Sequence, residues 1–155
     1  MPLTDQTFVS LEEIVEKEEG LPCASAPESR DLVATKLQNC FPTGVNTILL
    51  INPPMTTRDN FDLGMARSQS YPCYPPYGIA LLSTQLENRG YRTRLVDLNF
   101  ELMMQANTLS PNIFNYDHAW QEKLKNALGE FRPDLIGVTC MYTMIHPSMD
   151  AVVDF

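Results

Sequence analysis

Several residue patterns that would define a function are scarce or absent in this 155-residue sequence. It has only two histidines and one tryptophan, and its four cysteines form no C-x-x-C pair and no zinc-finger spacing with a histidine. The C-x-x-x-C-x-x-C triad that holds an iron–sulfur cluster is also absent. We therefore expect free thiols in a reducing compartment and no metal site of these classes.

Basic charge and long apolar stretches are scarce as well. The sequence has 11 basic and 19 acidic residues, and its first 31 residues contain eight acids and two bases. No stretch reaches the roughly 18 apolar residues that cross a bilayer, and the acidic N-terminus lacks the pattern of a secretory signal. These observations favour a cytoplasmic protein and argue against nucleic-acid and membrane partners.

The first 44 residues are interpreted as an acidic leader with two short helices. Ser10 and Glu13 form a capping-box pattern at the start of the first, and the second is expected from about Asp31 to Asn39. Pro42-Thr43-Gly44 then breaks the chain. Residues 45–155 form the second segment.

Three strands and four helices are predicted in residues 45–155. Strands are expected at 47–51, 92–98 and 135–140, the first and third of them buried, and helices at 78–89, 100–106 and 117–131 and from His146-Pro147 onward. Gly90 is expected to stop the helix at 78–89. The helix at 117–131 carries one apolar stripe, made of Trp120, Leu124, Ala127, Leu128 and Phe131. Residues 55–76 are expected to form a long, functional loop. The alternation predicts an α/β fold with a doubly wound, flavodoxin-like or Rossmann-like parallel sheet. Because three strands are few, we expect an incomplete sheet from a truncated product or the front of a larger domain.

Ligands of such sheets bind beyond the carboxyl ends of the strands, where the strand order reverses. The segments at these ends are 52–54, 97–99 and 139–142, and a strand order of 2-1-3 would place the first and third beside the pocket. A dinucleotide site is disfavoured because Asn52-Pro53-Pro54 has no glycine and two residues without an N–H. The chain also lacks a Walker loop and the aspartate that would end the third strand of a receiver domain.

Three segments, in this order, resemble the N-terminal cobalamin-binding domain of cobalamin-dependent radical SAM enzymes. They are ILLINPP, then YPPYGIALLSTQLENRGYRTRLVDLN, then FRPDLIGVTCM, and together they cover about residues 46–142. In that family a strand ending in Asn-Pro-Pro precedes a variable loop and a Pro-Pro-x-Gly helix start. The next strand ends in Asp-x-Asn, and Pro-Asp-Leu-x-Gly introduces the third.

The resemblance implies a set of cobalamin-contacting residues in this chain. The strand-one end would border the lower face of the corrin ring, the tyrosine- and proline-rich segment would shape the loop and helix start, and the third strand end would contact the ring or its nucleotide tail. The implied residues are Asn52, Pro53, Pro54, Tyr74, Pro76, Tyr77, Gly78, Asp97, Asn99, Thr139, Met141 and Tyr142. Prolines and tyrosines offer flat apolar surface, and Asn, Thr and Tyr can bond amide arms.

The resemblance also implies what this chain does not carry. No histidine occurs between Asn52 and Tyr91, so the strand-one loop would supply no lower ligand to cobalt. The 4Fe-4S cluster and S-adenosylmethionine would belong to a C-terminal radical SAM domain, in cis or in trans. The chain alone is therefore not expected to cleave S-adenosylmethionine. In the complete enzyme, cobalamin would serve methyl transfer or a radical rearrangement.

Simpler structural interpretations remain open for the same residues. Asn52-Pro53-Pro54 can be a strand terminator, Asp97 a cap or ion-pair partner, and the pairs Met103-Met104 and Met141-Met144 core filler. The alternative function is a non-catalytic α/β interaction or regulatory domain that keeps the fold without the cofactor. A small enzyme of another class ranks last, because no nucleophile–base pair is evident.

Overall fold

The computed structural model describes residues 26–155, and the chain divides into two units, Met1–Gly44 and Val45–Phe155. In the first unit, helix α2 spans Ala26–Cys40. The helix expected from Asp31 is therefore correct but begins five residues earlier, and Pro27 occupies its first turn, where proline is tolerated. The helix expected from Ser10 lies outside the described residues.

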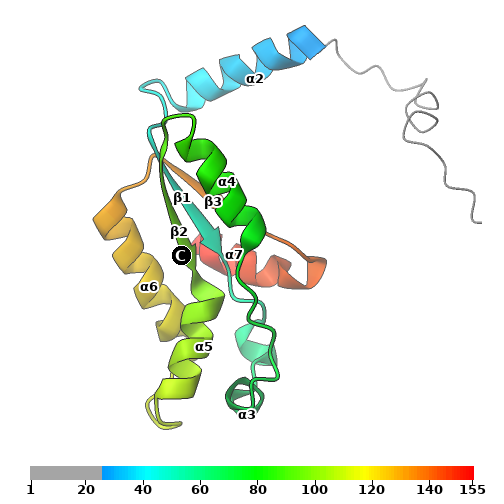
Figure 1. Ribbon diagram of the computed structural model, residues 1–155, viewed down its shortest axis with the longest axis vertical. Helices are drawn as coiled ribbons and strands as arrows, with labels where there is room; N and C mark the ends of the chain where they lie inside the picture. Colours follow the sequence, from blue (N-terminus) through cyan, green and yellow to red (C-terminus); the bar gives the residue numbers. More distant parts are fainter. Residues whose placement is uncertain (1–25) are drawn as a thin grey trace, which may run out of the picture. The chain divides into compact units, whose positions relative to one another are not determined.

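The second unit is built on a three-stranded parallel sheet (Figure 1). Its strands are β1 (Thr47–Asn52), β2 (Arg92–Asp97) and β3 (Leu135–Val138), in the order β2-β1-β3. In the register, Leu50 of β1 lies opposite Leu95 on one side and Gly137 on the other. The expected α/β fold with an open, doubly wound parallel sheet is confirmed, and the strand order is 2-1-3, the order that places the ends of the first and third strands side by side.

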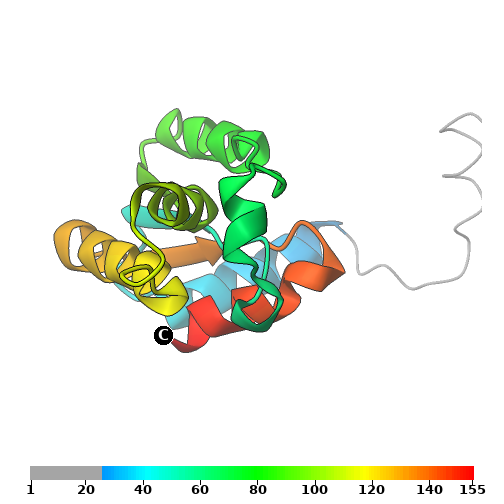
Figure 2. The ribbon, with the colours of Figure 1, turned by 90° about the horizontal axis from the view of Figure 1, so that it is seen from below.

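Helices lie on both faces of this sheet. α4 (Tyr77–Glu87) connects β1 to β2, α5 (Leu98–Thr108) and α6 (Tyr116–Phe131) connect β2 to β3, and α7 (His146–Asp154) follows β3. Figure 2 shows α4 on one side of the strands and α6 and α7 on the other. This follows from the strand order, because the crossovers from β1 to β2 and from β2 to β3 run in opposite directions across the sheet, and right-handed crossovers in opposite directions place their helices on opposite faces.

The main core lies between the sheet and helices α6 and α7. Leu49 and Ile51 of β1 are at most 1% exposed, and the apolar stripe predicted on α6 packs against them. That stripe contributes Trp120, Leu124 and Ala127, all nearly fully buried. The prediction of an amphipathic helix at 117–131 is therefore confirmed, with its start one residue earlier, at Tyr116.

Residues 55–76 are not the structureless loop that the sequence predicted. They contain a short 3-10 helix at Arg58–Asn60 and helix α3 at Leu63–Arg67. Asp62 caps α3 by accepting a hydrogen bond from the Met65 N–H at 2.7 Å. Phe61 stacks on Tyr71 and Phe114 at centroid distances of 5.6 and 5.5 Å, which anchors the segment to the rest of the unit.

Two strand predictions need correction. The second strand ends at Asp97 rather than Leu98, because Asp97 caps α5, which therefore begins at Leu98 and not at Phe100. The third strand ends at Val138, not at Cys140, and it is not buried on both faces. Leu135 and Ile136 are 37% and 46% exposed, since β1 is the only strand that pairs with β3 in the described chain.

Helix α4 covers the opposite face of the sheet incompletely. Ile79, Leu82 and Leu86 share one face of the helix, but Leu82 is 49% exposed and no residue of α4 is fully buried. The predicted glycine stop is correct. Gly90 has a φ of +90°, and its N–H donates to the Glu87 carbonyl at 2.9 Å as in a Schellman motif.

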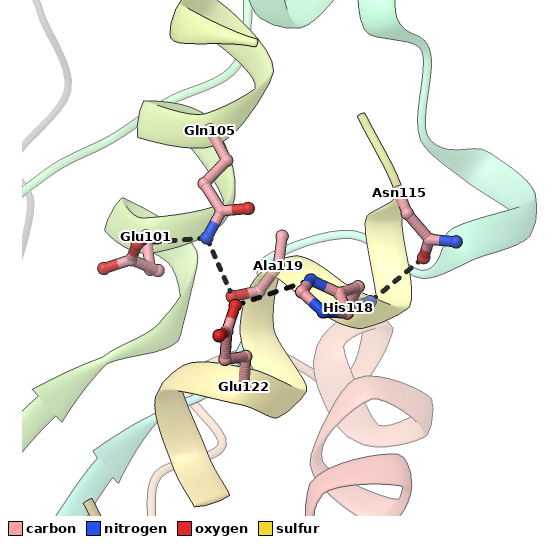
Figure 3. A network of polar contacts seen from close by, with 6 residues as sticks. All are labelled: Glu101, Gln105, Asn115, His118, Ala119 and Glu122. Carbon is pink, nitrogen blue, oxygen red and sulfur yellow. Dashed lines mark hydrogen bonds and ion pairs between the residues drawn. The ribbon is translucent and has the colours of Figure 1, made fainter. Parts of the chain in front are cut away.

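Polar contacts join α5 to α6 (Figure 3). The Gln105 Nε2–H donates to Glu101 within α5 at 3.2 Å and to the Ala119 carbonyl of α6 at 3.4 Å. On α6, the His118 Nδ1 lies 3.5 Å from the Glu122 carboxylate, on the solvated surface of the helix. Within residues 26–155, none of the helices has the length and apolar character needed to cross a bilayer.

Candidate functional site

The candidate site lies at the carboxyl ends of β1 and β3, which are neighbours in the sheet. The crossover from β1 runs toward β2, and β3 lies on the other side of β1, so the strand order reverses between β1 and β3. Pro53 directly after β1 and Thr139 directly after β3 therefore lie side by side. This is the position at which open α/β sheets bind ligands.

A cavity of about 400 Å³ opens at this position. We call it the rim cavity. Its wall comes from the end of β1, the tyrosine- and proline-rich segment before α4 and the segment after β3. It is lined by Asn52, Pro53, Met55, Thr56, Tyr71, Pro72, Tyr74, Pro75, Pro76, Thr139, Met141, Tyr142, Met144 and Ile145. None of these side chains is charged, so the wall is apolar surface with hydroxyl and amide groups.

A second cavity of about 300 Å³ adjoins the rim cavity along the sheet face below α4. We call it the sheet-face cavity. The two share Asn52, Pro76, Thr139 and Met141 in their walls. The sheet-face cavity continues over Leu50 and Gly137, beside the exposed Leu82 of α4. The two cavities therefore adjoin, and most residues in the wall of the sheet-face cavity are apolar.

Eight of the twelve residues that the resemblance implies line these two cavities. They are Asn52, Pro53, Tyr74, Pro76, Gly78, Thr139, Met141 and Tyr142. The other four do not. Pro54 is buried on another side of the strand-one loop, Tyr77 points into solvent with 75% exposure, and Asp97 and Asn99 hold the backbone.

Asp97 and Asn99 position the strand ends. One Asp97 carboxylate oxygen accepts hydrogen bonds from the Asn52 Nδ2–H at 2.9 Å and from the Phe100 N–H at 3.0 Å. Asn99 is 1% exposed, and its Oδ1 accepts a bond from the Met55 N–H at 3.0 Å. Asp97 thus orients the Asn52 amide, and Asn99 fixes the chain that leaves β1. Asp97 also caps α5, as the simpler structural interpretation of this residue predicted.

Tyr116 fixes the next residues of the rim. Its hydroxyl donates to the Thr56 carbonyl, and its ring lies 5.2 Å from that of Phe61. Burial, with a smaller contribution from Asp117, raises the pKa of Tyr116 well above its ordinary value. Its hydroxyl therefore stays protonated and remains a donor over the physiological pH range.

Within residues 45–155, the thiols and imidazoles lie outside the rim cavity. Cys40, Cys73 and Cys140 are free and exposed, and burial followed by the charge of Asp97 raises the pKa of the Cys73 thiol. His146 is 3.1 Å from Asp150 on α7. In residues 26–155 no three His, Cys, Asp or Glu side chains are grouped to hold a metal ion.

Sequence reasoning missed several lining residues. Met55, Thr56 and Met144 join the wall, and Met141 and Met144 are 61% and 77% exposed. The interpretation of Met141 and Met144 as core filler is therefore wrong, as it is for Met104 at 46%, whereas Met103 is buried. The signal that could have found Met144 is its place just beyond a strand end, next to residues already implicated.

The arrangement suits binding rather than acid–base or nucleophilic catalysis. The rim cavity offers neutral donors and acceptors on flat apolar walls, and its lining contains no histidine, cysteine, lysine, arginine or carboxylate side chain. Comparisons of the chain with protein-family models, with curated proteins and with solved structures find no match.

Proposed function

We propose that this chain is a cobalamin-binding module of a radical SAM enzyme. The observation that carries the proposal is the uncharged rim cavity at the carboxyl ends of β1 and β3, whose wall includes seven of the residues that the sequence resemblance implies. They are Asn52, Pro53, Tyr74, Pro76, Thr139, Met141 and Tyr142. In the complete enzyme, bound cobalamin supplies a carrier for methyl transfer or a radical rearrangement.

The chemistry of the wall fits one face or edge of a corrin. A corrin is a broad, mostly apolar plate with amide arms, and the wall presents proline and tyrosine faces together with isolated amide and hydroxyl groups. The Asn52 Nδ2–H is already bound to Asp97, which leaves the amide oxygen as an acceptor for an amide arm. Thr139 and Tyr142 add hydroxyl groups from the other strand end.

The proposal includes cobalamin without a histidine ligand from the strand-one loop. Both histidines lie in the described part of the chain, His118 on α6 and His146 on α7, and neither lines the rim cavity. The iron–sulfur cluster and S-adenosylmethionine would bind to a radical SAM domain supplied in cis or in trans. The proposed setting is cytoplasmic, with no nucleic-acid or membrane partner.

A matched pair of tyrosine variants tests the proposal. Tyr74 and Tyr77 are 76% and 75% exposed, but only Tyr74 lines the rim cavity. Hydroxocobalamin is titrated into the full chain, and binding is followed by the visible spectrum and by co-elution. We expect saturable binding that Tyr74→Ala weakens by about tenfold, the loss of roughly one aromatic contact, while Tyr77→Ala leaves it unchanged. Absence of saturable binding, or equal losses in both variants, contradicts the proposal.

One observation favours the alternative of a non-catalytic interaction domain. Leu135 and Ile136 of β3 and Leu81 and Leu82 of α4 are all at least 37% exposed, which is a large apolar surface for so small a unit. If hydroxocobalamin fails to bind while a protein partner protects these four residues from solvent, the interaction domain is the better description. Amide and side-chain protection measured by footprinting distinguishes the two.

A further inference from the structure

The three-stranded sheet has two edges, and they differ in charge. Within the described chain, β2 and β3 each pair with β1 on one side only. β2 carries Arg92 and Arg94, whereas β3 carries no charged residue. Charged side chains on an edge strand hinder its pairing with another chain. The outer side of β2 therefore has this protection, and the outer side of β3, which we call the β3 edge, does not.

The side chains of β3 leave apolar surface on both faces of this edge. Successive side chains of a strand point to opposite faces. Val138 packs against the main core, so Ile136 lies on the same face, where it is 46% exposed. Leu135 and Gly137 lie on the face of α4, and Leu135 is 37% exposed. A strand added at the β3 edge would cover apolar side chains on each face.

Gly137 leaves space beside the β3 edge on the face of α4. The sheet-face cavity, of about 300 Å³, extends over Gly137 and Thr139, and Leu82 of α4 also lines it. A side chain at position 137 would crowd the core, because its Cβ would lie 3.1 Å from the Leu50 Cδ2. A side chain on a neighbouring strand reaches this space instead, since paired residues on one face have Cβ atoms about 4.5–5.5 Å apart.

A second copy of the β3 edge supplies such a strand. A two-fold axis through Gly137, perpendicular to the sheet, pairs the two β3 strands antiparallel. Leu135 of each copy then lies opposite Thr139 of the other copy and diagonal to its Gly137, beside the sheet-face cavity. On the other face, Ile136 of each copy lies opposite Val138 of the other. The exposed leucine and the space beside the glycine are therefore complementary under this symmetry.

Charge favours the same occupant. The equivalent operation about Thr93 of β2 would set Arg92 of one copy opposite Arg94 of the other, and like charges across paired strands are destabilising. No charged residue of β3 meets a like charge in the pairing about Gly137. Residues 45–155 contain eleven acidic and eight basic residues, so the unit that carries the β3 edge repels its copy only weakly.

We propose that the β3 edge binds a second copy of this chain, which joins two sheets into one with the strand order β2-β1-β3-β3-β1-β2. The pairing uses the β3 edge of both copies and leaves only the two arginine-carrying edges, so association stops at the dimer. A contact of one strand pair is smaller than a standard protein–protein interface, so the dimer dissociates on dilution. This interface does not depend on the proposed cobalamin function.

Sedimentation velocity of the full chain without cobalamin, over a wide range of protein concentrations, tests the proposal. We expect a reversible equilibrium between monomer and dimer, with no larger species. Hydrogen exchange measured across the same range locates the contact. Exchange at the amides of residues 135–139 should slow as the concentration rises, because dimerisation gives the outward-facing N–H groups of β3 a hydrogen-bond partner.

Two matched pairs of variants separate the β3 edge from other exposed surface. Ile136 and Ile113 are 46% and 68% exposed, and only Ile136 lies on β3. Ile136→Lys should raise the dissociation constant of the dimer at least tenfold, because it buries a charge in each copy, whereas Ile113→Lys should leave the constant unchanged.

The second pair tests the fit on the face of α4. Leu135→Ala should weaken the dimer by about tenfold, because the symmetry removes the side chain from both copies. Leu81 of α4 is 64% exposed and does not line the sheet-face cavity, so Leu81→Ala should dimerise as the unaltered chain does.

Four results would overturn the proposal. The first is a chain that stays monomeric at every concentration, and the second is association that continues beyond the dimer. The third is an equal dissociation constant for Ile136→Lys and Ile113→Lys. The fourth is slow exchange at residues 135–139 that does not change with concentration, which would show that the β3 edge is covered within a single chain.

Discussion

Strands β1 and β3 are both short apolar runs, yet β1 is buried and β3 is partly exposed to solvent. Ile48–Ile51 of β1 are at most 5% exposed, whereas Leu135 and Ile136 of β3 are 37% and 46% exposed. β1 pairs with a strand on each side, and β3 pairs only with β1 in the described chain. An apolar run therefore predicts a strand, while the neighbours of that strand decide how far it is buried.

The largest expected effect comes from truncating one side chain in each strand. Leu49 and Ile136 lie opposite each other in the register of β1 and β3. Leu49→Ala should lower the free energy of unfolding by about 2–5 kcal/mol, because it leaves a cavity in the main core. Ile136→Ala should cost less than about 1 kcal/mol, since its side chain is half exposed. Chemical denaturation of both variants measures the contrast, and equal losses would show that β3 is covered in solution.

A smaller difference in the free energy of unfolding is expected between glycine substitutions at the two ends of α4, the helix that covers β1 and β2. Gly90 has a φ of +90°, so Gly90→Ala should lower the free energy of unfolding by about 1–2 kcal/mol. At Gly78 an added Cβ would meet no atom within 4 Å, so Gly78→Ala should raise it by roughly 0.5–1 kcal/mol. Thermal unfolding followed by circular dichroism tests both, and a destabilising Gly78→Ala would contradict this picture of the helix start.

The exposed edge of β3 should also affect self-association. Ile136→Lys places a charge on an unpaired strand, a device that natural proteins use against edge pairing. We expect less concentration-dependent light scattering and a change in the free energy of unfolding within about 0.5 kcal/mol. A large destabilisation would mean that Ile136 is buried in the protein in solution, and the contrast between the strands would then disappear.

The smallest effect concerns the pH dependence of the junction between β1 and β3. The Asp134 carboxylate accepts bonds from the Asn46 and Thr47 N–H groups, both at 2.9 Å, and from the Thr47 hydroxyl at 3.0 Å. The backbone bonds, first from Asn46, lower the pKa of Asp134. Because the folded pKa is below the unfolded value, this stabilisation is present above that value, roughly pH 4, and is lost as pH falls through the folded pKa.

Melting temperatures of the unaltered chain and of Asp134→Ala should therefore differ at neutral pH and converge in acid, below about pH 4. Asp150→Ala, on α7 and away from this junction, serves as the control. A difference that stays constant from neutral pH to acid would show that the carboxylate does not hold the two strands together.

Much of the fold could be predicted from the sequence because its signals are local. The run Thr47–Ile51 is apolar and is ended by prolines, so the position of β1 is well defined. Gly90 supplied a stop signal, and the stripe on α6 repeats at helical spacing. The parallel arrangement followed from the alternation of strands and helices.

The remaining features depend on contacts between distant residues. The structure of residues 55–76 is stabilised by Phe61 packing on Phe114, more than 50 positions later in the chain. The exposure of β3 depends on which strands surround it. Neither property is encoded in the local pattern, so the sequence predicted a loop in the first case and a buried strand in the second.

The candidate site shows the same division. Asn52 and Thr139 could be expected to lie together because the carboxyl ends of neighbouring parallel strands meet at one edge. The sequence could not show that Tyr74 lines the rim cavity while Tyr77 does not, because the orientation of each ring depends on how the chain enters α4. Met144 was assigned to the core since its residue type alone favours burial.

Methionine methyl resonances show whether cobalamin binds in the rim cavity. Met55, Met141 and Met144 line the rim cavity, whereas Met65 and Met104 do not. Full-length chain labelled at methionine methyl groups is titrated with hydroxocobalamin and observed by NMR. We expect saturable shifts of the Met55, Met141 and Met144 resonances, while those of Met65 and Met104 do not shift. Unchanged resonances of Met141 and Met144 at saturating hydroxocobalamin would contradict it.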